Sequence, residues 1–347
     1  MSKNVYVGLS GGVDSSVTAA LLKQQGYNVT GVYMKNWSKD LPGFECPWKE
    51  DFQDAKRVAV QLGIPFKMFD FETEYRQKVV DYMVAEYQAG RTPNPDIMCN
   101  QEVKFKLFLE AALEDGADMI ATGHYAKVKD GKLLRAKDDN KDQTYFLYRV
   151  TENALKHTLF PLGDYTKPEV RKLAEKYGLV TTAKKESMGI CFVGKVGIKD
   201  FLLYELGPQA PGSIVDQNRV AVGQHEGAIF YTIGQRHGLD VGGGMPYYVV
   251  GKDMGKNEVY VTTDISDKRL WERTFEMSST HWINNEPADG QKVQVRTRHR
   301  APLIDAGLKR DGKNFAVELK DEIRALTPGQ SAVIYDGDTV LGGGIII

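Results

Sequence analysis

Apolar and polar positions in the first part of the chain follow two alternating periods. Short apolar runs, typical of buried strands, begin at Val5 and recur at 28–34, 65–71 and 118–123. The stretches between them have apolar residues at helical spacing, behind the first run and at 49–62, 73–87 and 101–114. Strands that alternate with helices form parallel sheets with helices on both faces. This part is therefore predicted to be an α/β domain with ligands beyond the carboxyl ends of its strands.

The pattern changes near Lys195, where helical spacing gives way to short apolar runs separated by glycine turns. Examples are "GSIVD", "AIFYTIGQ", "GGGMPYYVVGKD" and "NEVYVTTD". Such material is typical of all-β domains, and its last part has the strand spacing of a small barrel. We therefore expect an α/β domain at 1–195, a β-rich central domain at 196–272 and a C-terminal β-barrel at 273–347.

The stretch "VYVGLSGGVDSS", from Val5 to Ser16, reads as a strand, a glycine loop and a helix start. Glycines let the backbone approach an anion closely, and the free amides of a helix start point toward it. A tight turn without a ligand is the alternative. The loop has no lysine, so it differs from the GxxxxGK[ST] loop of phosphoryl-transfer enzymes. We expect phosphate binding here.

Cys99 lies in "RTPNPDIMCN", which we interpret as a stiff polar turn before a helix that begins at Gln101 with Asn100 as its N-cap. The partial positive charge of a helix start favours thiolate over thiol. Asp96, in the same turn, could move a proton. The arrangement indicates a catalytic element, and a solvated turn with an incidental cysteine is the alternative.

The other two cysteines carry less information when they are taken alone. Cys191 lies in the apolar run "SMGICFVG", which favours a buried structural thiol, although flanking glycines and nearby lysines leave other roles open. Cys46 has no evident partner residues and is interpreted as structural or incidental. Three cysteines in 347 residues are an odd number at low density, which argues against a disulfide framework.

Near the C-terminus, "KVQVRTRHRA" alternates with a period of two. One face would carry Lys292, Gln294, Arg296, Arg298 and Arg300, and the opposite face Val293, Val295, Thr297 and His299. We call the first set the basic face and expect it to contact RNA phosphates; a solvated strand is the alternative.

Composition adds limits to this picture. The length allows two or three domains, and the formal net charge of −1 places any RNA contact on a local basic patch. The N-terminus resembles neither a signal peptide nor a transit segment, and no apolar run reaches the roughly 18 residues of a membrane span. We therefore expect a cytoplasmic protein without a membrane partner. His225 and His237 lack the spacing of metal ligands, so no protein-held metal site is expected.

Taken together, the motifs resemble those of the tRNA-specific 2-thiouridylases. They are S-G-G-V-D-S, P-N-P-D-x-x-C-N, T-G-H-Y-A, K-D-Q-x-Y-F-L and G-I-C-F-x-G, followed by "YTIGQRHGL" and "LGGGII", and they span almost the whole chain. The resemblance implies ATP-dependent insertion of sulfur at C2 of the wobble uridine. It also implies that the first loop is the pyrophosphate loop of enzymes that cleave ATP between its α- and β-phosphates.

The resemblance assigns roles residue by residue. Cys99 would be the catalytic cysteine, Cys191 the carrier of a persulfide and Asp96 the acid or base, with Asp14 helping to place Mg²⁺. The positions implied for ATP are Gly8, Leu9, Ser10, Gly11, Gly12, Val13, Asp14, Ser15, Met34 and Gly123. The positions implied for tRNA are Asn94, Pro95 and Asp96 at the target base, and His124, Lys141, Asp142, Gln143, Arg296, Thr297 and Gln330 elsewhere.

The implied partners are tRNA and a cysteine desulfurase or sulfur-relay protein that supplies the persulfide. Two other functions remain open at this point. An adenylating synthetase for a small metabolite would need neither paired cysteines nor a basic barrel. An RNA-binding or sulfur-carrier module would not need an intact pyrophosphate loop.

Overall fold

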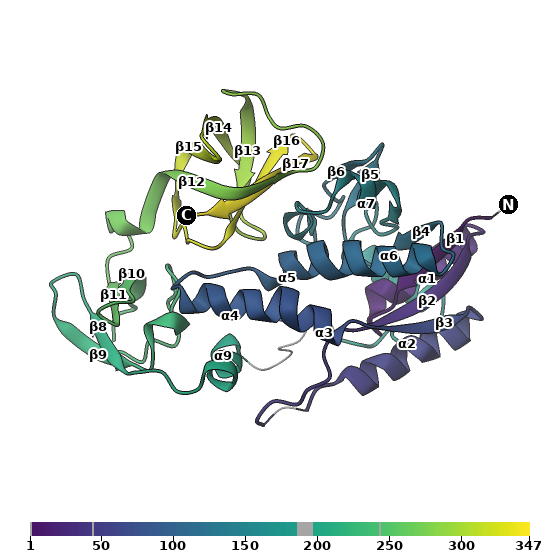
Figure 1. Cartoon of the computed structure of the whole chain (residues 1–347), viewed down its shortest axis with the longest axis horizontal. Coiled ribbons are helices and arrows are strands. Elements are labelled where there is room, and N and C mark those ends of the chain that lie inside the picture. The colour runs from purple at the N-terminus through teal and green to yellow at the C-terminus, as the bar shows by residue number, and fades with distance from the viewer. Residues whose placement is uncertain (1, 44, 186–196, 243) are drawn as a thin grey trace.

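Five parallel strands form the first sheet of the computed structural model, in the order β3-β2-β1-β4-β7 (Figure 1). The structure describes residues 2–43, 45–185, 197–242 and 244–347. The strands are β1 (Asn4–Gly8), β2 (Asn28–Lys35), β3 (Phe66–Asp70), β4 (Met119–Ala121) and β7 (Thr158–Leu159). The first three long crossovers are helical, as the alternating periods predicted.

Alternate residues of these strands supply two cores, one on each face of the sheet. Val5 and Val7 of β1 pack with helices α1 and α2, whereas Tyr6 between them packs with the helices of the opposite face. The helices of this part are α1 (Val13–Gln24), α2 (Trp48–Leu62), α3 (Glu72–Tyr75), η1 (Arg76–Val80), α4 (Asp81–Gln88), α5 (Pro95–Met98), η2 (Cys99–Leu107), α6 (Phe108–Glu114), η3 (Thr144–Phe146), α7 (Glu152–Lys156) and α8 (Lys167–Lys176). The sheet is therefore covered by helices on both faces, as the periods of the apolar residues predicted.

The central part contains a small mixed sheet, in the order β10-β11-β8-β9, in which β11 and β8 are parallel. Its elements are α9 (Ile198–Leu206), β8 (Gly212–Val215), β9 (Ala221–His225), η4 (Ala228–Phe230), β10 (Tyr248–Asp253) and β11 (Glu258–Thr262). The apolar run "AIFYTIGQ" is not a strand as predicted. It forms a single 3₁₀ turn entered through Gly227, whose φ of 140° does not continue a strand.

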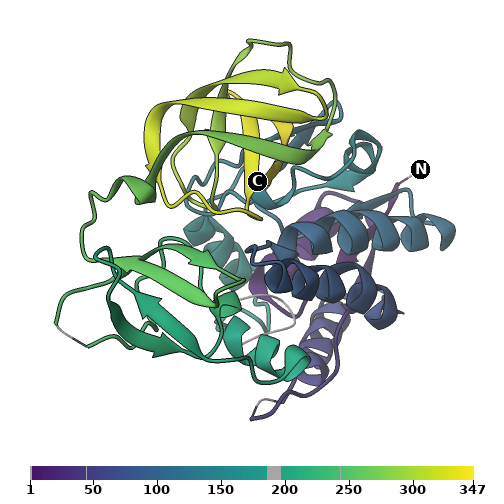
Figure 2. The same cartoon turned by 60° about the vertical axis from the view of Figure 1, so that its left-hand side comes forward.

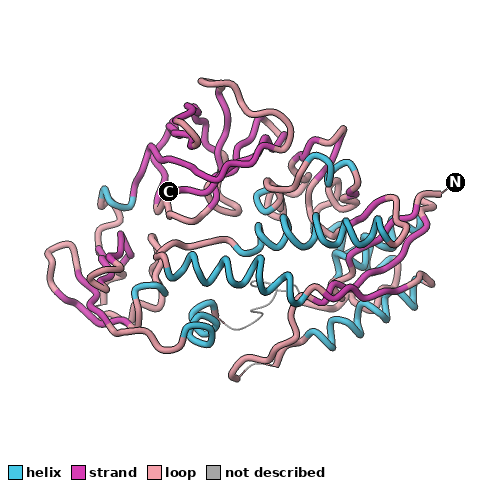
Figure 3. Tube along the Cα trace, in the orientation of Figure 1, coloured by secondary structure: helices cyan, strands magenta, loops and turns pink. Residues whose placement is uncertain are grey.

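Six antiparallel strands close into a barrel at the C-terminus, because β12 pairs with both β15 and β17 (Figure 2). They follow η5 (Lys268–Leu270) and are β12 (Trp271–Trp282), β13 (Lys292–Arg296), β14 (Ile304–Asp311), β15 (Asn314–Arg324), β16 (Ser331–Asp336) and β17 (Thr339–Ile346). Alternate side chains, such as Val293 and Val295, fill the interior. The predicted order of an α/β part, a β-rich centre and a barrel is confirmed, and Figure 3 shows most helix in the first part.

A hairpin from the first part joins the barrel sheet. Strands β5 (Lys127–Lys129) and β6 (Lys132–Leu134) pair with each other, and β6 pairs with β17. The sequence pattern did not predict this hairpin, because a three-residue strand gives almost no periodic signal. None of the helices in the described residues is long and apolar enough to cross a membrane.

Candidate active site

The loop after β1 is held in shape by its own hydroxyl groups. Ser15 Oγ donates to the carbonyl of Gly12 over 3.1 Å and accepts the backbone N–H of Ser10 over 3.2 Å. Strand β1 ends at Gly8 and helix α1 begins at Val13, so the loop leads from a strand end to a helix start. Backbone amides at a helix start favour anionic ligands. This is the geometry of a phosphate-binding turn.

Two glycines in and beside the loop have no room for a side chain. Gly11 has a φ of +73°, and a Cβ on it would lie 2.5 Å from the carbonyl oxygen of Asp51. A Cβ on Gly123 would lie 2.8 Å from the backbone nitrogen of Ser15. Gly123, just beyond the end of β4, therefore packs directly on the first turn of α1. The fold therefore brings Gly123 against Asp14 and Ser15, although they are far apart in the sequence.

Other positions assigned to the nucleotide have different surroundings. Met34, near the end of β2, places its terminal methyl 2.9 Å from where a Cβ on Gly8 would lie. Leu9 and Val13 have buried side chains, so only their backbone faces the loop. Met34 and Gly123 thus flank the loop at the carboxyl end of the sheet, where ligands of such folds bind.

Asp14, in the first turn of α1, holds two polar groups from elsewhere in the chain. Lys167 Nζ lies 2.7 Å and 2.9 Å from its two carboxylate oxygens, and the Tyr125 hydroxyl donates to one of them over 3.0 Å. Mg²⁺ is commonly held by one or two carboxylates together with substrate phosphates. A single carboxylate beside a phosphate loop fits that pattern. Within the described residues, no cluster of three or more His, Cys, Asp or Glu side chains could hold a metal.

The surroundings of Cys99 differ most from what the sequence predicted. The chain becomes helical at Pro95, with Asn94 as the N-cap residue, and it stays helical through α5, η2 and α6. Proline at the first helical position needs no hydrogen-bond partner for its nitrogen and already has a helical φ, so it starts the helix. Asn100 is therefore inside the helix and is not its N-cap; its side-chain amide donates to the carbonyl of Phe146 over 2.9 Å.

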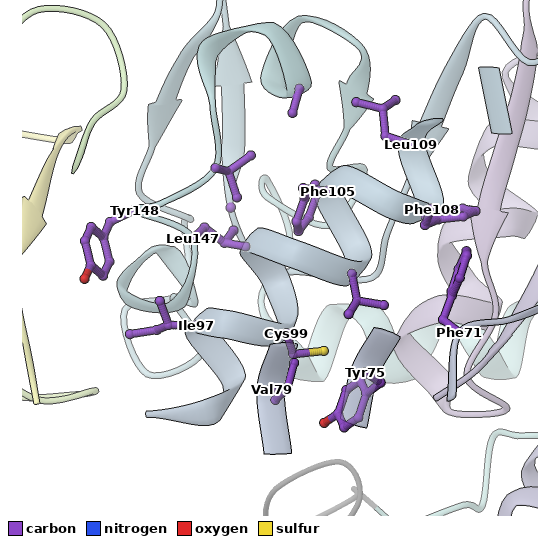
Figure 4. Close-up of a cluster of buried hydrophobic side chains, with 14 of the residues drawn as sticks. Phe71, Tyr75, Val79, Ile97, Cys99, Phe105, Phe108, Leu109, Leu147 and Tyr148 are labelled. Carbon is purple, nitrogen blue, oxygen red and sulfur yellow. The ribbon is translucent and has the colours of Figure 1, made fainter. Parts of the chain in front are cut away.

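Cys99 is consequently buried, with 1% of its surface exposed, and does not lie in an open loop. Figure 4 shows its sulfur among apolar side chains that include Val79 and Tyr75. It begins the π-helical segment η2, and such wider turns occur frequently at functional sites. Burial of this kind limits access to the thiol until a ligand or another segment reaches it.

Asp96 lies almost one turn before Cys99 on the same helix. Burial raises the pKa of the Asp96 carboxyl, and the positive charge of Lys104 opposes that shift. A raised pKa keeps the acid protonated over more of the pH range, as a proton donor requires. Asp96 and Cys99 are three residues apart and therefore lie on one face of the helix. The sequence pattern predicted a turn at these positions.

His124 stands beside this helix, next to Gly123. Its Nδ1 lies 2.8 Å from the hydroxyl of Thr122, and its ring packs at 5.6 Å from that of Phe105 in η2. Burial lowers the pKa of the imidazole well below its usual value. The ring is therefore neutral near pH 7 and can act in hydrogen bonding or packing without a charge.

The segment 141–143 is fastened to the barrel by a buried ion pair. Arg296 Nη1 lies 2.9 Å from Asp142 Oδ2, and the two side chains are 6% and 0% exposed. Gln143 accepts the backbone N–H of Tyr125 through its Oε1 over 2.9 Å, whereas Lys141 is partly exposed. Asp142 and Arg296 therefore contact each other, and neither side chain is available at the surface.

The prediction of an exposed basic face is wrong, because Arg296 is buried in its ion pair with Asp142. Strand β13 ends at Arg296. Arg298 then turns to the carbonyl of Ala325, at 2.6 Å, and the hydroxyl of Thr327, at 2.8 Å. Only Lys292 and Arg300 of the five expected side chains are exposed. Period-two alternation cannot show where a strand stops or that an arginine has a buried carboxylate partner.

His299, which the predicted alternation places on the face opposite the arginines, is partly buried. Its ring packs on Phe146 at 4.6 Å, and burial with neighbouring arginines lowers the pKa of its imidazole to about 4. Thr297, one of the positions implied for tRNA, is partly exposed.

Gln330 contacts the segment just before the helix that carries Asp96 and Cys99. Its Nε2 donates to the carbonyl of Thr92 over 2.8 Å, and the Thr92 N–H donates to the carbonyl of Pro328 over 3.0 Å. The Thr92 hydroxyl also lies 3.1 Å from that of Thr232 in the central part. All three parts of the molecule therefore meet at Thr92, three residues before the helix that carries Asp96 and Cys99.

The structure does not bring the other two cysteines into this site within the residues that it describes. Cys191 lies outside the described residues, although Lys184 before it is ion-paired to Asp51 and Asp54 of α2, at 2.8 Å and 2.6 Å. Cys46 is half-buried, with its sulfur 3.7 Å from the carbonyl of Trp37, and burial raises the pKa of its thiol. This environment favours an unreactive thiol.

Comparison with known proteins first defines the class: an α/β domain of the HUP type joined to two β domains. Three family models match in chain order, described as the tRNA methyl transferase HUP domain (residues 3–195), the tRNA methyl transferase PRC-barrel domain (199–263) and the aminomethyltransferase beta-barrel domain (272–346).

Full-length relatives then give the family. The tRNA-specific 2-thiouridylase MnmA of Streptococcus sanguinis is 47% identical over 99% of this chain and 94% of its own. That of Shewanella amazonensis is 48% identical over the same shares. The chain belongs to the tRNA-specific 2-thiouridylase family. Among solved structures, a 4-thiouridine synthetase–RNA complex with bound ATP is 18% identical, with a TM-score of 0.39, over 58% of this chain and 49% of that chain.

Proposed function

We propose that this protein is an ATP-dependent tRNA uridine 2-sulfurtransferase, which replaces the C2 oxygen of a wobble uridine with sulfur. The observation that carries the proposal is the full-length identity to proteins named tRNA-specific 2-thiouridylase. The family models are named after methyl transfer instead. The loop after β1 supports the thiouridylase name, because an enzyme that activates an oxygen with ATP must hold the phosphates of the nucleotide.

The residue types suit this chemistry. A uridine C2 carbonyl is a poor electrophile, and transferring AMP from ATP to its oxygen makes that oxygen part of a good leaving group. The loop from Gly8 to Ser15, with Met34 and Gly123 beside it, would hold the ATP. Asp14 would place Mg²⁺ with the phosphates. Pyrophosphate leaves in this step and AMP leaves in the next.

The sulfur step would use the two remaining assignments. A persulfide on Cys191 provides sulfur that is nucleophilic near neutral pH. After that sulfur bonds to C2 and AMP departs, the Cys99 thiolate attacks Cys191, which breaks the persulfide S–S bond and leaves a Cys99–Cys191 disulfide. Release of the sulfur as sulfide before attack would produce the same disulfide. Asp96, with its raised pKa, would donate and accept the proton.

Recognition of tRNA would use the surface around this helix. We assign Asn94, Pro95 and Asp96 to the target base, and His124, Lys141, Gln143, Thr297 and Gln330 to further contacts. Asp142 and Arg296 would act by holding Lys141 and Gln143 in place, since their own charges pair with each other. A cysteine desulfurase or sulfur-relay protein would load Cys191, and the reaction would take place in the cytoplasm.

One experiment tests the proposal as a whole. The protein is incubated with ATP labelled at the α- or γ-phosphate, a sulfide source and unmodified tRNA, and the nucleosides are analysed by mass spectrometry. We expect 2-thiouridine, with AMP and pyrophosphate as the nucleotide products. Formation of ADP and phosphate would contradict adenylation. Cleavage of ATP driven by a small metabolite in place of tRNA would favour a synthetase.

A further inference from the structure

A lysine from helix α8 reaches the phosphate loop, which has none of its own. Lys167, the first residue of α8, is 153 positions away from Asp14 in the sequence, yet its ammonium lies 2.7 Å from that carboxylate. The ammonium also lies 5.9 Å from the ring centroid of Tyr125. The Lys167 side chain is only 12% exposed. A long, flexible side chain is thus held over the first turn of α1.

A purely structural role explains this contact poorly. Helices α1 and α8 already share an apolar interface in which Val13 and Val17 pack with Val170 and Ala174. Asp14 does not require a cation, because a carboxylate in the first turn of a helix is favoured by the helix dipole. Withdrawing a lysine from water also costs free energy and side-chain entropy. The packing of α8 would be complete without the ion pair.

A role in binding phosphate explains the contact between Lys167 and Asp14 directly. The loop offers backbone amides, which carry only partial charges, and its one charged side chain, Asp14, is negative. A bound triphosphate or pyrophosphate carries several negative charges and needs a full positive charge nearby. Lysine is a common phosphate-binding residue and acts as a point charge. Lys167 already has its ammonium at the edge of the loop.

We propose that Lys167 is the phosphate-binding cation of this site and that Asp14 holds it in position until the nucleotide binds. The proposal rests on the use of ATP inferred above. On binding, the ammonium would exchange the Asp14 carboxylate for the β- and γ-phosphate oxygens. The carboxylate oxygens of Asp14 would then be available to a divalent cation carried by the phosphates, which reconciles the ion pair with the Mg²⁺ role assigned to Asp14.

Equilibrium binding without tRNA tests the first half of the proposal. ATP, pyrophosphate and adenosine are titrated into the wild type, Lys167→Met and Lys167→Arg. Because a charge-assisted hydrogen bond is removed, Lys167→Met should bind ATP and pyrophosphate roughly 10- to 100-fold more weakly. Adenosine affinity should stay within about twofold, since adenosine carries no phosphate to contact. Lys167→Arg should retain most of the affinity, because the charge remains.

The matched control is Lys137→Met. Lys137 is a neighbouring lysine whose ammonium pairs with Glu169 of α8 at 3.0 Å, and its side chain is 49% exposed. It should bind all three ligands as the wild type does. Equal pyrophosphate affinity in Lys167→Met and wild type would overturn the proposal. A wild type that does not bind ATP would instead count against the proposed function.

A double-mutant cycle with a metal chelator tests the exchange. Without a divalent cation, Asp14→Asn should bind pyrophosphate more tightly than the wild type, because Lys167 no longer has a competing carboxylate. Most of that gain should disappear in Asp14→Asn/Lys167→Met. The gain in the double variant is measured against Lys167→Met. If it equals the gain of Asp14→Asn over the wild type, it comes only from removing a negative charge, and Lys167 is not a ligand. Circular dichroism and thermal melting of each variant separate these outcomes from a loss of fold.

Discussion

At the scale of single residues, burial determines how Asp96 and Cys99 can act. Both lie on one helix; Asp96 is partly buried and its pKa is raised, and Cys99 is buried in the core of the first part. A carboxyl with a raised pKa and a thiol shielded from other reagents suit a reaction in which sulfur must be delivered to one atom. The helix, more rigid than a turn, supplies the required orientation.

Asp96→Asn should slow thiolation by about 10²- to 10⁴-fold while ATP and tRNA binding stay nearly unchanged, because general acid–base catalysis is removed. The wild-type rate should fall as the pH rises through the raised pKa of Asp96, and the variant should lack that limb. Single-turnover thiolation between pH 5 and pH 9 measures both effects. A wild-type rate in the variant would make Asp96 a structural residue.

The same residue gives a prediction for stability. The folded state binds the Asp96 proton more tightly than the unfolded chain does, so its contribution to stability is complete below the ordinary carboxyl pKa and is lost as the pH rises through the raised value. Asp96→Asn should therefore melt at a higher temperature than the wild type at pH 7. The difference should shrink as the pH is lowered, which thermal melting at several pH values would reveal.

The three cysteines should differ in a sulfur-loading experiment. After loading with labelled sulfur by a cysteine desulfurase, Cys99→Ser should still hold label on Cys191, and Cys191→Ser should hold none that can pass to tRNA. Both should fail to form 2-thiouridine, whereas Cys46→Ser should match the wild type. Thiolation by Cys191→Ser from the desulfurase, or full activity of Cys99→Ser, would show that the roles are assigned wrongly.

At the scale of elements, the connection between segment 141–143 and strand β13 rests on one buried charge pair. Arg296→Ala would leave the buried Asp142 carboxylate with only the Arg135 guanidinium, whose Nε lies 3.8 Å away, so the loss should not exceed the roughly 3–5 kcal/mol of unfolding free energy that breaking a buried pair typically costs. Chemical denaturation should show this decrease. Replacing both residues, in Arg296→Met/Asp142→Leu, should cost less than the single change, because the buried carboxylate is then removed together with its cation.

Exposed Arg300 provides the contrast in RNA binding. If Arg300 neutralises a tRNA phosphate, Arg300→Ala should reduce the salt dependence of tRNA binding by about 0.7–0.9 in log K against log salt. Arg296→Ala, measured where it is still folded, should leave that slope unchanged. A reduced slope for Arg296→Ala would mean that the guanidinium leaves Asp142 when tRNA binds.

At the scale of the whole molecule, the junction at Thr92 joins the barrel and the central part to the helix that carries Asp96 and Cys99. Gly329 makes this contact possible: its φ is +91°, and a Cβ on it would lie 2.8 Å from the backbone nitrogen of Thr92. Gly329→Ala should therefore push the barrel away from the first part. We expect slower thiolation and faster proteolysis between the parts, with ATP affinity unchanged.

Gly337→Ala is the matched control for this junction. Gly337 also lies in the barrel and has a φ of +56°, but a Cβ on it would have no heavy atom of another part of the chain within 4 Å. Its backbone strain, about 1 kcal/mol, should resemble that of Gly329→Ala without the clash. If the two variants thiolate tRNA equally well, the Thr92 junction does not position the catalytic helix.

Much of the fold follows from local patterns. The period of two in β1 and the period of 3.6 in α1 and α2 specify which residues enter the cores on the two faces of the sheet. The glycines of the first loop mark the strand-to-helix turn, and Gly11 has the positive φ that such a turn needs. Neighbours along the chain produce these signals, so they can be recognised without a fold.

The start of the cysteine helix shows where such patterns fail. Prolines at 93 and 95 are compatible with a turn and equally with the first residue of a helix, and only packing of that helix in the core distinguishes them. Cys99 was therefore identified as a candidate but placed in the wrong environment. A local pattern gives residue types and spacing, and it does not give burial.

The order of the three parts, the phosphate loop and the candidate thiols could all be predicted from the sequence, because each depends on residues close together in the chain. The pairing of Arg296 with Asp142 and of Lys167 with Asp14, across separations of 154 and 153 residues, emerged only in the folded chain. The same is true of the hairpin β5–β6 that joins the barrel sheet. Such contacts arise when separately patterned elements pack together, and the charges, burial and reach of their side chains are fixed only by that packing.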